Sequence, residues 1–147
     1  MRFLLSCLCL SFVLILAGCG TPADRRLDAP AIEITGLTAG GDGYALALRL
    51  TNSNTVPLVV RHSTHTLYLG DKRIGRIEDR EPIGVPPLGA ASHTVALPKA
   101  LAADVRFWLT NHAGEVHASM DSSLEIVIGE DDSMILKSTG RGTVKAP

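Results

Sequence analysis

Residues 43–54 read GYALALRLTNSN and contain the clearest structural pattern in the chain. Tyr44, Leu46, Leu48 and Leu50 alternate there with small or polar residues. Successive side chains of a strand point to opposite faces, so this period of two predicts a β-strand with one face in an apolar core. The polar run 52–54 should end the strand, because short polar side chains bond to the nearby backbone and favour turns.

The same alternation recurs on both sides of this stretch. Glycine, proline and short polar residues separate the alternating segments, as is typical of strands joined by turns and hairpins. The sequence therefore predicts a mostly β chain: an antiparallel β-sandwich of the fibronectin or immunoglobulin type, with about seven strands. The further strands are expected at 32–36, 58–61, 64–69, 73–80, 93–97, 116–128 (as one long strand or a bulged pair) and 134–138, with a glycine turn at 40–43, a hairpin at 70–72 and a long connection at 82–89.

The period changes after Pro98. Apolar residues then recur at Leu101, Val105, Trp108 and Leu109, which is the spacing of one helix face. Together with an alanine-rich start and a glycine shortly after the last apolar position, this predicts one amphipathic helix over 99–111. A strand at 105–109 stays open as the alternative. Trp108 and its neighbour Phe107 are expected in the core.

The N-terminal segment predicts export and lipidation. A charged start is followed by an apolar stretch that is shorter than the roughly 20 residues of a membrane-spanning helix. It ends in Leu16-Ala17-Gly18-Cys19, which resembles the lipobox of bacterial lipoproteins. The resemblance implies that residues 1–18 are a signal peptide and that Cys19 carries the lipid. The alternative is a secreted protein in which this cysteine is incidental.

The cysteine count agrees with that interpretation. Cys7 and Cys9 would leave with the signal peptide, so that Cys19 remains as the single cysteine and no internal disulfide can form. One acyl chain anchors a protein only marginally, and the two or three chains of a lipoprotein would hold it firmly. Because Gly20 follows the cysteine, enteric-type sorting favours the outer membrane, at its periplasmic face, over the inner membrane.

The charge balance limits the partners. Without Arg2, 13 of the 14 basic residues remain against 15 acidic ones, a formal balance of −2. Such a chain lacks the basic footprint of a nucleic-acid-binding protein.

We expect residues 19–30 to be a tether, 31–140 to be the folded domain and 141–147 to be a tail. The expected partners are the membrane, through the lipid, and an envelope protein or lipid.

The order of features between residues 30 and 138 resembles the late embryogenesis abundant (LEA) group 2 family, also called the water stress and hypersensitive response (WHy) domain. The chain departs from the family at Ser53, where proline is usual, so it loses proline's fixed φ at that turn. The resemblance therefore depends on overall order. The matching segments are Gly36-Leu37, the strand that runs into Asn52-Ser53-Asn54, Pro57-Leu58-Val59-Val60, Thr66-Leu67-Tyr68-Leu69-Gly70, and Pro86-Pro87-Leu88-Gly89 before Ser92-His93-Thr94-Val95.

This resemblance implies a small seven-stranded sandwich with one helix, no catalytic site and no cofactor. It links the chain to tolerance of desiccation, cold and other stress, and it makes Asn52, Ser53 and Asn54 a structural turn motif. A second function class stays open: a carrier of lipids or other apolar ligands, or an accessory subunit of an envelope assembly.

The remaining polar residues predict no enzyme and no metal site. His62 and His65 are three apart, which in a strand places them on opposite faces, so we expect them to be exposed or hydrogen-bonded. Glu130-Asp131-Asp132 is too short an acidic run for a calcium loop. Ser92-His93 lacks the surroundings of a nucleophile. The charges at 76–81 predict a solvated edge strand that discourages aggregation.

Overall fold

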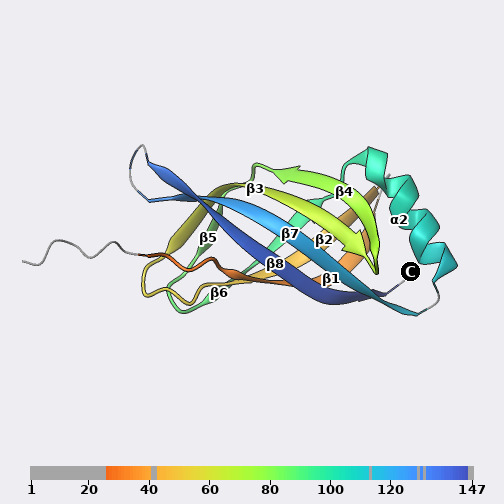
Figure 1. Cartoon of the computed structure of the whole chain (residues 1–147), viewed down its shortest axis with the longest axis horizontal. Helices are drawn as coiled ribbons and strands as arrows, with labels where there is room; N and C mark the ends of the chain where they lie inside the picture. The colour runs from red at the N-terminus through yellow and green to blue at the C-terminus, as the bar shows by residue number, and fades with distance from the viewer. Residues whose placement is uncertain (1–25, 41–42, 113, 129, 131, 146–147) are drawn as a thin grey trace, which may run out of the picture.

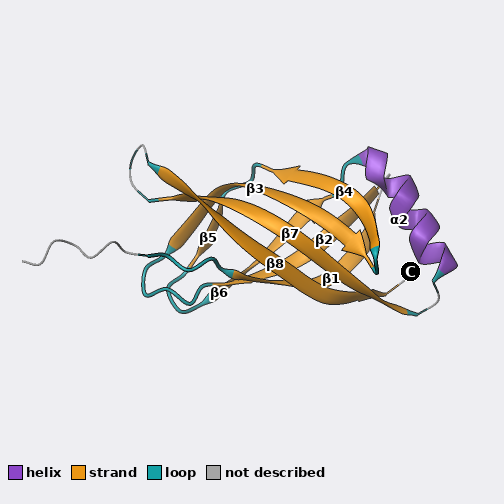
Figure 2. Cartoon of the chain, in the orientation of Figure 1, coloured by secondary structure: helices purple, strands orange, loops and turns teal. Residues whose placement is uncertain are grey.

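The computed structural model describes residues 26–40, 43–112, 114–128, 130 and 132–145 of the chain. In this part the protein is mostly β with one helix, as the sequence predicts (Figures 1 and 2). In chain order the elements are β1 (Ala31–Gly40), β2 (Gly43–Thr51), β3 (Leu58–Leu69), β4 (Lys72–Asp79), β5 (Ile83–Val85), β6 (Ala90–Ala96), α2 (Lys99–Asn111), β7 (Glu115–Val127) and β8 (Ser133–Lys145).

The strands form one continuous curled sheet in the order β4-β3-β7-β8-β1-β2-β6, with β5 also pairing on β3. All pairs are antiparallel except β1 with β8, which run parallel where residues 32–34 meet residues 140–142. The predicted antiparallel sandwich of about seven strands is thus met only in part. Hydrophobic alternation shows which residues face the core, but it does not show which strands are neighbours or in which direction they pair.

Most strands lie where the sequence places them, but several are longer. The two expected pieces at 58–61 and 64–69 are one strand, β3, whose register against β7 shifts between Val60 and His62. Such a bulge adds a residue, so the side chains that face the core change from even to odd positions. The alternation is therefore interrupted, and the sequence predicts two strands where there is one. β7 is likewise one strand, and β5 lies within the expected connection. β8 continues to Lys145, so residues 141–145 belong to the sheet rather than to a tail.

The curled sheet encloses one apolar core. Figure 1 shows β3, β7 and β8 across the front and β1 and β2 behind them. Leu46 and Leu48 of β2 lie in the same buried cluster as Leu67 of β3 and Leu124 and Ile126 of β7. A fully buried leucine or isoleucine contributes roughly 1.5–3 kcal/mol relative to exposure, so this shared core holds the two faces of the curl together.

The helix has the bounds that the sequence predicts, Lys99–Asn111, and the alternative strand is wrong. It lies across one end of the sheet (Figure 1) and buries Val105 and Leu109. Trp108 packs against the same core, whereas Phe107 is 65% exposed. The expectation of a core Phe107 is wrong because one residue turns a helix by about 100°, which carries this ring off the apolar face. Within the described residues, none of the helices is long and apolar enough to cross a membrane.

Candidate functional site

The predicted lipidation site, Cys19, lies outside the described residues, as do the signal peptide and most of the expected tether. The first described residue is Arg26, and the chain joins the sheet at Ala31. The acylation of Cys19 therefore stays a prediction, and the described site begins where the chain enters the domain.

The Asn52–Asn54 turn follows β2, and its two asparagine side chains form several hydrogen bonds. Asn52 is buried, and its Nδ2 donates to the carbonyls of Val56, Val85 and Pro86 at 2.8, 3.3 and 3.1 Å. Its Oδ1 accepts from the backbone N–H of Asn54 at 2.8 Å. This side chain adds to two backbone hydrogen bonds between the loop after β2 and the loop after β5, from Asn52 N–H to the Gly89 carbonyl and from Leu88 N–H to the Asn54 carbonyl.

Asn54 extends this network to the entering chain. The backbone N–H of Asp28 donates to Asn54 Oδ1, and Asn54 Nδ2 donates to the Asp28 carbonyl, both at 2.9 Å. Leu27 packs against the core beside this pair. The last residues of the expected 19–30 tether are therefore fixed to the domain. The sequence predicts a turn at Asn54 but contains no signal for its contact with Asp28, which is 26 residues away.

A second polar group lies inside the sheet. His65 is 3% exposed and sits between two hydroxyls, with its Nε2 2.8 Å from Ser63 Oγ and its Nδ1 2.8 Å from Ser122 Oγ. A neutral imidazole has one donor and one acceptor nitrogen, which two hydroxyls satisfy. Burial lowers the pKa of His65 from 6.5 to about 4, against the opposing effect of the Asp79 carboxylate, so the ring is neutral at neutral pH.

Asp79 and His93 bridge the two edges of the curled sheet. Asp79 ends β4 and His93 lies in β6, the strands at opposite ends of the strand order. His93 Nε2 and Asp79 Oδ2 are 2.5 Å apart, and the side chains are only 9% and 13% exposed. The seam of the curl is therefore closed at this point by side chains. The expected solvated edge holds for Arg76 and Glu78, which form an exposed pair, and it is wrong for Asp79.

The sequence contained part of the signal for this polar group. His65 has the same parity as Leu67 and Leu69, so it could have been assigned to the core face of β3. The expectation that it is hydrogen-bonded is confirmed. His93 shares parity with the buried Val95, but its partner on β4 depends on the closure of the curl, which no local pattern encodes.

The hydrogen bonds of His65 and His93 differ from those of a catalytic triad. A catalytic triad places histidine between a nucleophile and a carboxylate, whereas both ring nitrogens of His65 meet hydroxyls and His93 bonds to a carboxylate. The expectation that His62 is exposed or hydrogen-bonded is wrong for its Nε2, which is buried and meets no hydrogen-bond partner among the described residues. In the part of the chain that the structure describes, no three His, Cys, Asp or Glu side chains are placed to hold a metal ion. Glu130 and Asp132 are exposed, and Asp131 lies outside the described residues.

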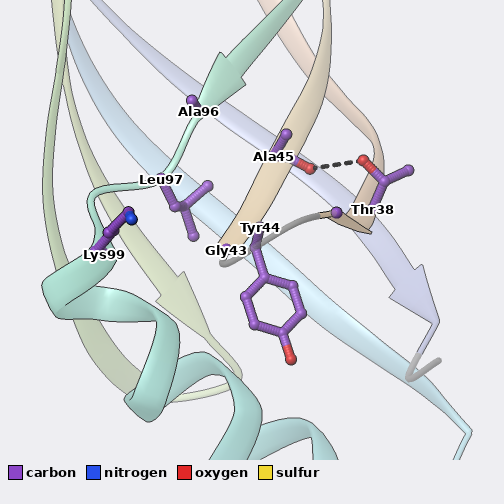
Figure 3. A pocket seen from close by; sticks show the side chains of 8 residues that line it. Thr38, Gly43, Tyr44, Ala45, Ala96, Leu97 and Lys99 are labelled. Carbon is purple, nitrogen blue, oxygen red and sulfur yellow. Dashed lines mark hydrogen bonds between the residues drawn. The ribbon is translucent and has the colours of Figure 1, made fainter.

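A pocket of about 320 Å³ opens near the start of α2. Figure 3 shows Tyr44 and Leu97 in its wall, with Ala45 and Ala96 beside them and Lys99 at its rim. The volume is at the lower end of the range for small-molecule sites, and the aromatic and aliphatic wall suits an apolar group. No pattern in the sequence indicates this pocket, because its lining comes from β1, β2, the end of β6 and the start of α2.

These features define a small, mostly β domain with one helix, held by polar contacts at its loops and along its seam. No known protein family and no curated protein matches the sequence. Solved structures of similar fold include AT1g01470 from Arabidopsis thaliana, at 15% identity over 85% of this chain and 88% of that one, with a TM-score of 0.57. This likeness shows the fold.

Two other solved structures share the arrangement less closely. A protein from Archaeoglobus fulgidus is 16% identical over 81% of this chain and 98% of its own, with a TM-score of 0.41. At2g46140.1, described as a candidate LEA protein, is 15% identical over 90% of this chain and 75% of its own, with a TM-score of 0.46.

Proposed function

We propose that this chain is a lipid-anchored protein of the bacterial cell envelope, whose non-catalytic domain is of the LEA group 2 type and protects the envelope during desiccation or other stress. The observation that carries the anchoring is Leu16-Ala17-Gly18-Cys19 at the end of a short apolar segment. The order of motifs around Asn52–Asn54 supports the LEA group 2 assignment, and the fold shared with AT1g01470 is compatible with it. Fold alone does not define function.

The outer face of the sheet suggests how protection could work. Two shallow hollows of about 330 and 260 Å³ lie over β3, β7 and β8. Hydroxyl and charged groups of Thr64, Thr66, Asp121, Lys137 and Thr139 line them. Such groups can replace water at polar headgroups or glycans when water is scarce, because each offers a hydrogen-bond donor or acceptor.

The anchoring is tested with Cys19→Ala in the native host. Wild-type protein should carry the added mass of a diacylglyceryl group and sediment with membranes. The variant should lack that mass and be released as soluble protein or retained unprocessed. Intact-mass analysis of both fractions measures this, and an unmodified wild-type Cys19 would contradict the proposal.

Protection is tested by drying. A deletion strain complemented with wild-type protein should survive desiccation better than the same strain complemented with a Thr64→Val, Thr66→Val, Thr139→Val variant, which keeps side-chain shape and removes three outer hydroxyls. Equal membrane levels of the two proteins, measured by immunoblotting, provide the control. Equal survival of the wild-type, deletion and variant strains would contradict a protective role.

The pocket at Tyr44 and Leu97 favours a second candidate, a carrier of apolar ligands. Native protein would then contain extractable lipid in stoichiometric amount beyond its own anchor. Ala96→Phe should abolish that content, because Ala96 is exposed in the pocket wall and a ring there would fill the space. Lipid-free wild-type protein would contradict the carrier function and leave the protective one.

A further inference from the structure

Exposed apolar side chains gather at one end of the molecule. Among the described residues, five large hydrophobic side chains are exposed, and four of these lie away from the helix. Soluble surfaces usually scatter such residues singly, and a cluster marks an interaction surface. The four are Val59, Leu88, Ile128 and Ile135, and the fifth, Phe107, is on α2.

Strand register places three of these residues at one end of the sheet, and a backbone hydrogen bond places the fourth in a loop at the same end. Val59 is opposite Val127 at the end of β7, and Ile128 follows directly. Ile135 is opposite Glu125 near the start of β8. Leu88 lies in the loop before β6, and its backbone N–H donates to the Asn54 carbonyl at 3.0 Å. We call these four residues the entry-end cluster.

The name reflects where the chain enters the domain. Asn54, which holds the Leu88 loop, also holds Asp28. Figure 1 shows residues 26–30, the end of β7, the start of β8 and the loops after β2 and β5 at the same end, with α2 at the other. Cys19 precedes Arg26 by seven residues, a span of at most about 25 Å when fully extended.

We propose that the entry-end cluster is a lipid-contacting surface that inserts into the interface of the bilayer in which the chain is anchored. The proposal deepens, and rests on, the proposed lipidation of Cys19. The seven-residue span holds this end near the bilayer, whereas the 13-residue β7 places the helix end about 40 Å away. An anchored domain binds with a high effective concentration, so a small apolar surface suffices.

The backbone at Leu88 supports the assignment. Among the described residues, Leu88 is the only one other than glycine that has a positive φ, and the angle is 49°. Its side chain is 70% exposed. The left-handed region disfavours a bulky side chain, and strain of this kind is concentrated at ligand-contacting positions. An exposed leucine held in that conformation contributes nothing to the core and projects an apolar group from the entry end.

Charge selects the kind of lipid. Arg61 and Glu125 pair with each other at 3.8 Å beside Val59, which leaves no net charge there. Arg26 and Asp28, both exposed where the chain enters, offset each other in charge, and Lys137 is exposed two residues beyond Ile135. Glu130 and Asp132 are exposed close to Ile128, so the excess negative charge lies on that side. The surface is thus apolar with a negative margin, and it fits zwitterionic headgroups better than anionic ones.

Tryptophan quenching tests the proposal on the full lipidated chain in vesicles of brominated phosphatidylcholine. Wild-type protein has a single tryptophan, Trp108, at the helix end. Leu88→Trp and Ile128→Trp should each lose about half of the added emission, as expected for a side chain 5–10 Å into the interface. Phe107→Trp, the matched exposed control, and wild-type protein should keep theirs.

The outcomes separate the anchor from the inference. Acylated, vesicle-bound protein whose Leu88→Trp and Ile128→Trp emission is unquenched overturns the lipid contact and leaves the anchor. Equal quenching of Phe107→Trp overturns a preferred end. Unquenched emission together with a dimer mass assigns the cluster to a second copy and overturns the proposal. Protein without acyl mass that does not bind vesicles removes the anchor itself, and with it the lipid contact.

Replacing part of the phosphatidylcholine with phosphatidylglycerol should reduce quenching, and an increase would contradict the charge argument.

Discussion

At the scale of single residues, Asn52 is the side chain on which the loop contacts converge. Asn52→Ala leaves the carbonyls of Val56, Val85 and Pro86 without this donor in a buried site. We expect the free energy of unfolding to fall by about 2–3 kcal/mol, since unsatisfied buried polar groups are costly. Urea denaturation followed by Trp108 fluorescence measures the change. Ser53→Ala, at an exposed neighbour, is the control, and an equal effect of both variants would contradict the assigned role.

His65 predicts how stability depends on pH. Its folded pKa of about 4 is below the unfolded value of 6.5, so the unfolded chain takes up the proton first as pH falls. The stabilisation is fully present above about pH 6.5 and is lost toward pH 4. A difference of this size corresponds to about 3 kcal/mol.

Urea denaturation at pH 7 and pH 4.5 checks this dependence. Because the charges of Asp79, His93 and His62 also act on His65, the test is the difference between wild-type protein and His65→Gln, which keeps hydrogen-bonding groups and has no imidazole. The variant should lose less stability between the two pH values. An identical pH dependence of the two proteins would exclude His65 as the cause.

Which residues face the core could be predicted from the sequence, because alternation is a local property. Tyr44 to Leu50 and the even positions of β7 follow it directly. The partners of Asn54 and His93 could not be predicted, since Asp28 and Asp79 meet them only after distant strands come together. The candidate site is therefore mostly a product of the tertiary fold.

At the scale of elements, the parallel pairing of β1 with β8 depends on a missing side chain. A Cβ at Gly142 would lie 1.9 Å from the Ile34 carbonyl oxygen, a backbone atom that cannot move without separating the strands. We expect Gly142→Ala to lower the free energy of unfolding by about 3 kcal/mol. Gly84→Ala is the control, because a Cβ there meets nothing within 4 Å, and its effect should stay within about 0.5 kcal/mol. Similar denaturation midpoints for both variants would refute the close approach of the strands.

The seam between β4 and β6 is a second element-scale feature. Asp79→Ala and His93→Ala should each destabilise the domain by about 1–3 kcal/mol, since each leaves a mostly buried partner unpaired. The double variant should lose less than the sum, with a coupling of about 1–2 kcal/mol. The same cycle on the exposed pair Arg76 and Glu78 should give a coupling of less than about 0.5 kcal/mol. Additive effects at Asp79 and His93 would show that the seam is held by other contacts.

At the scale of the whole molecule, the sequence predicts the β class and the helix but not the closure of the sheet. The helix is correct in both bounds because its four-residue apolar spacing and its glycine-marked end are local. The strands β1 and β8 are neighbours in the sheet although most of the chain separates them in sequence. A hydrogen bond from Ser138 Oγ to the Pro30 carbonyl is one contact between these distant segments. The pattern of core residues is the same for two antiparallel sheets and for one curled mixed sheet, so it could not distinguish them.

The boundary between the tether and the domain is a whole-molecule property that proteolysis can measure. Leu27 packs against the core and Asp28 is held by Asn54 through two hydrogen bonds, so the Arg26–Leu27 bond should resist trypsin in the folded protein. Proteases need several residues on each side of the bond to detach, and detachment here requires loss of these contacts. Asn54→Ala should therefore speed cleavage at Arg26 by about tenfold, the factor expected for a loss of about 1.4 kcal/mol.

Mass spectrometry of a time course identifies the site. Ser53→Ala should cleave at the wild-type rate. If Asn54→Ala and wild-type protein are cut equally fast, then the fixed domain starts after Asp28 and the entry end is held less closely to the anchor than the structure implies.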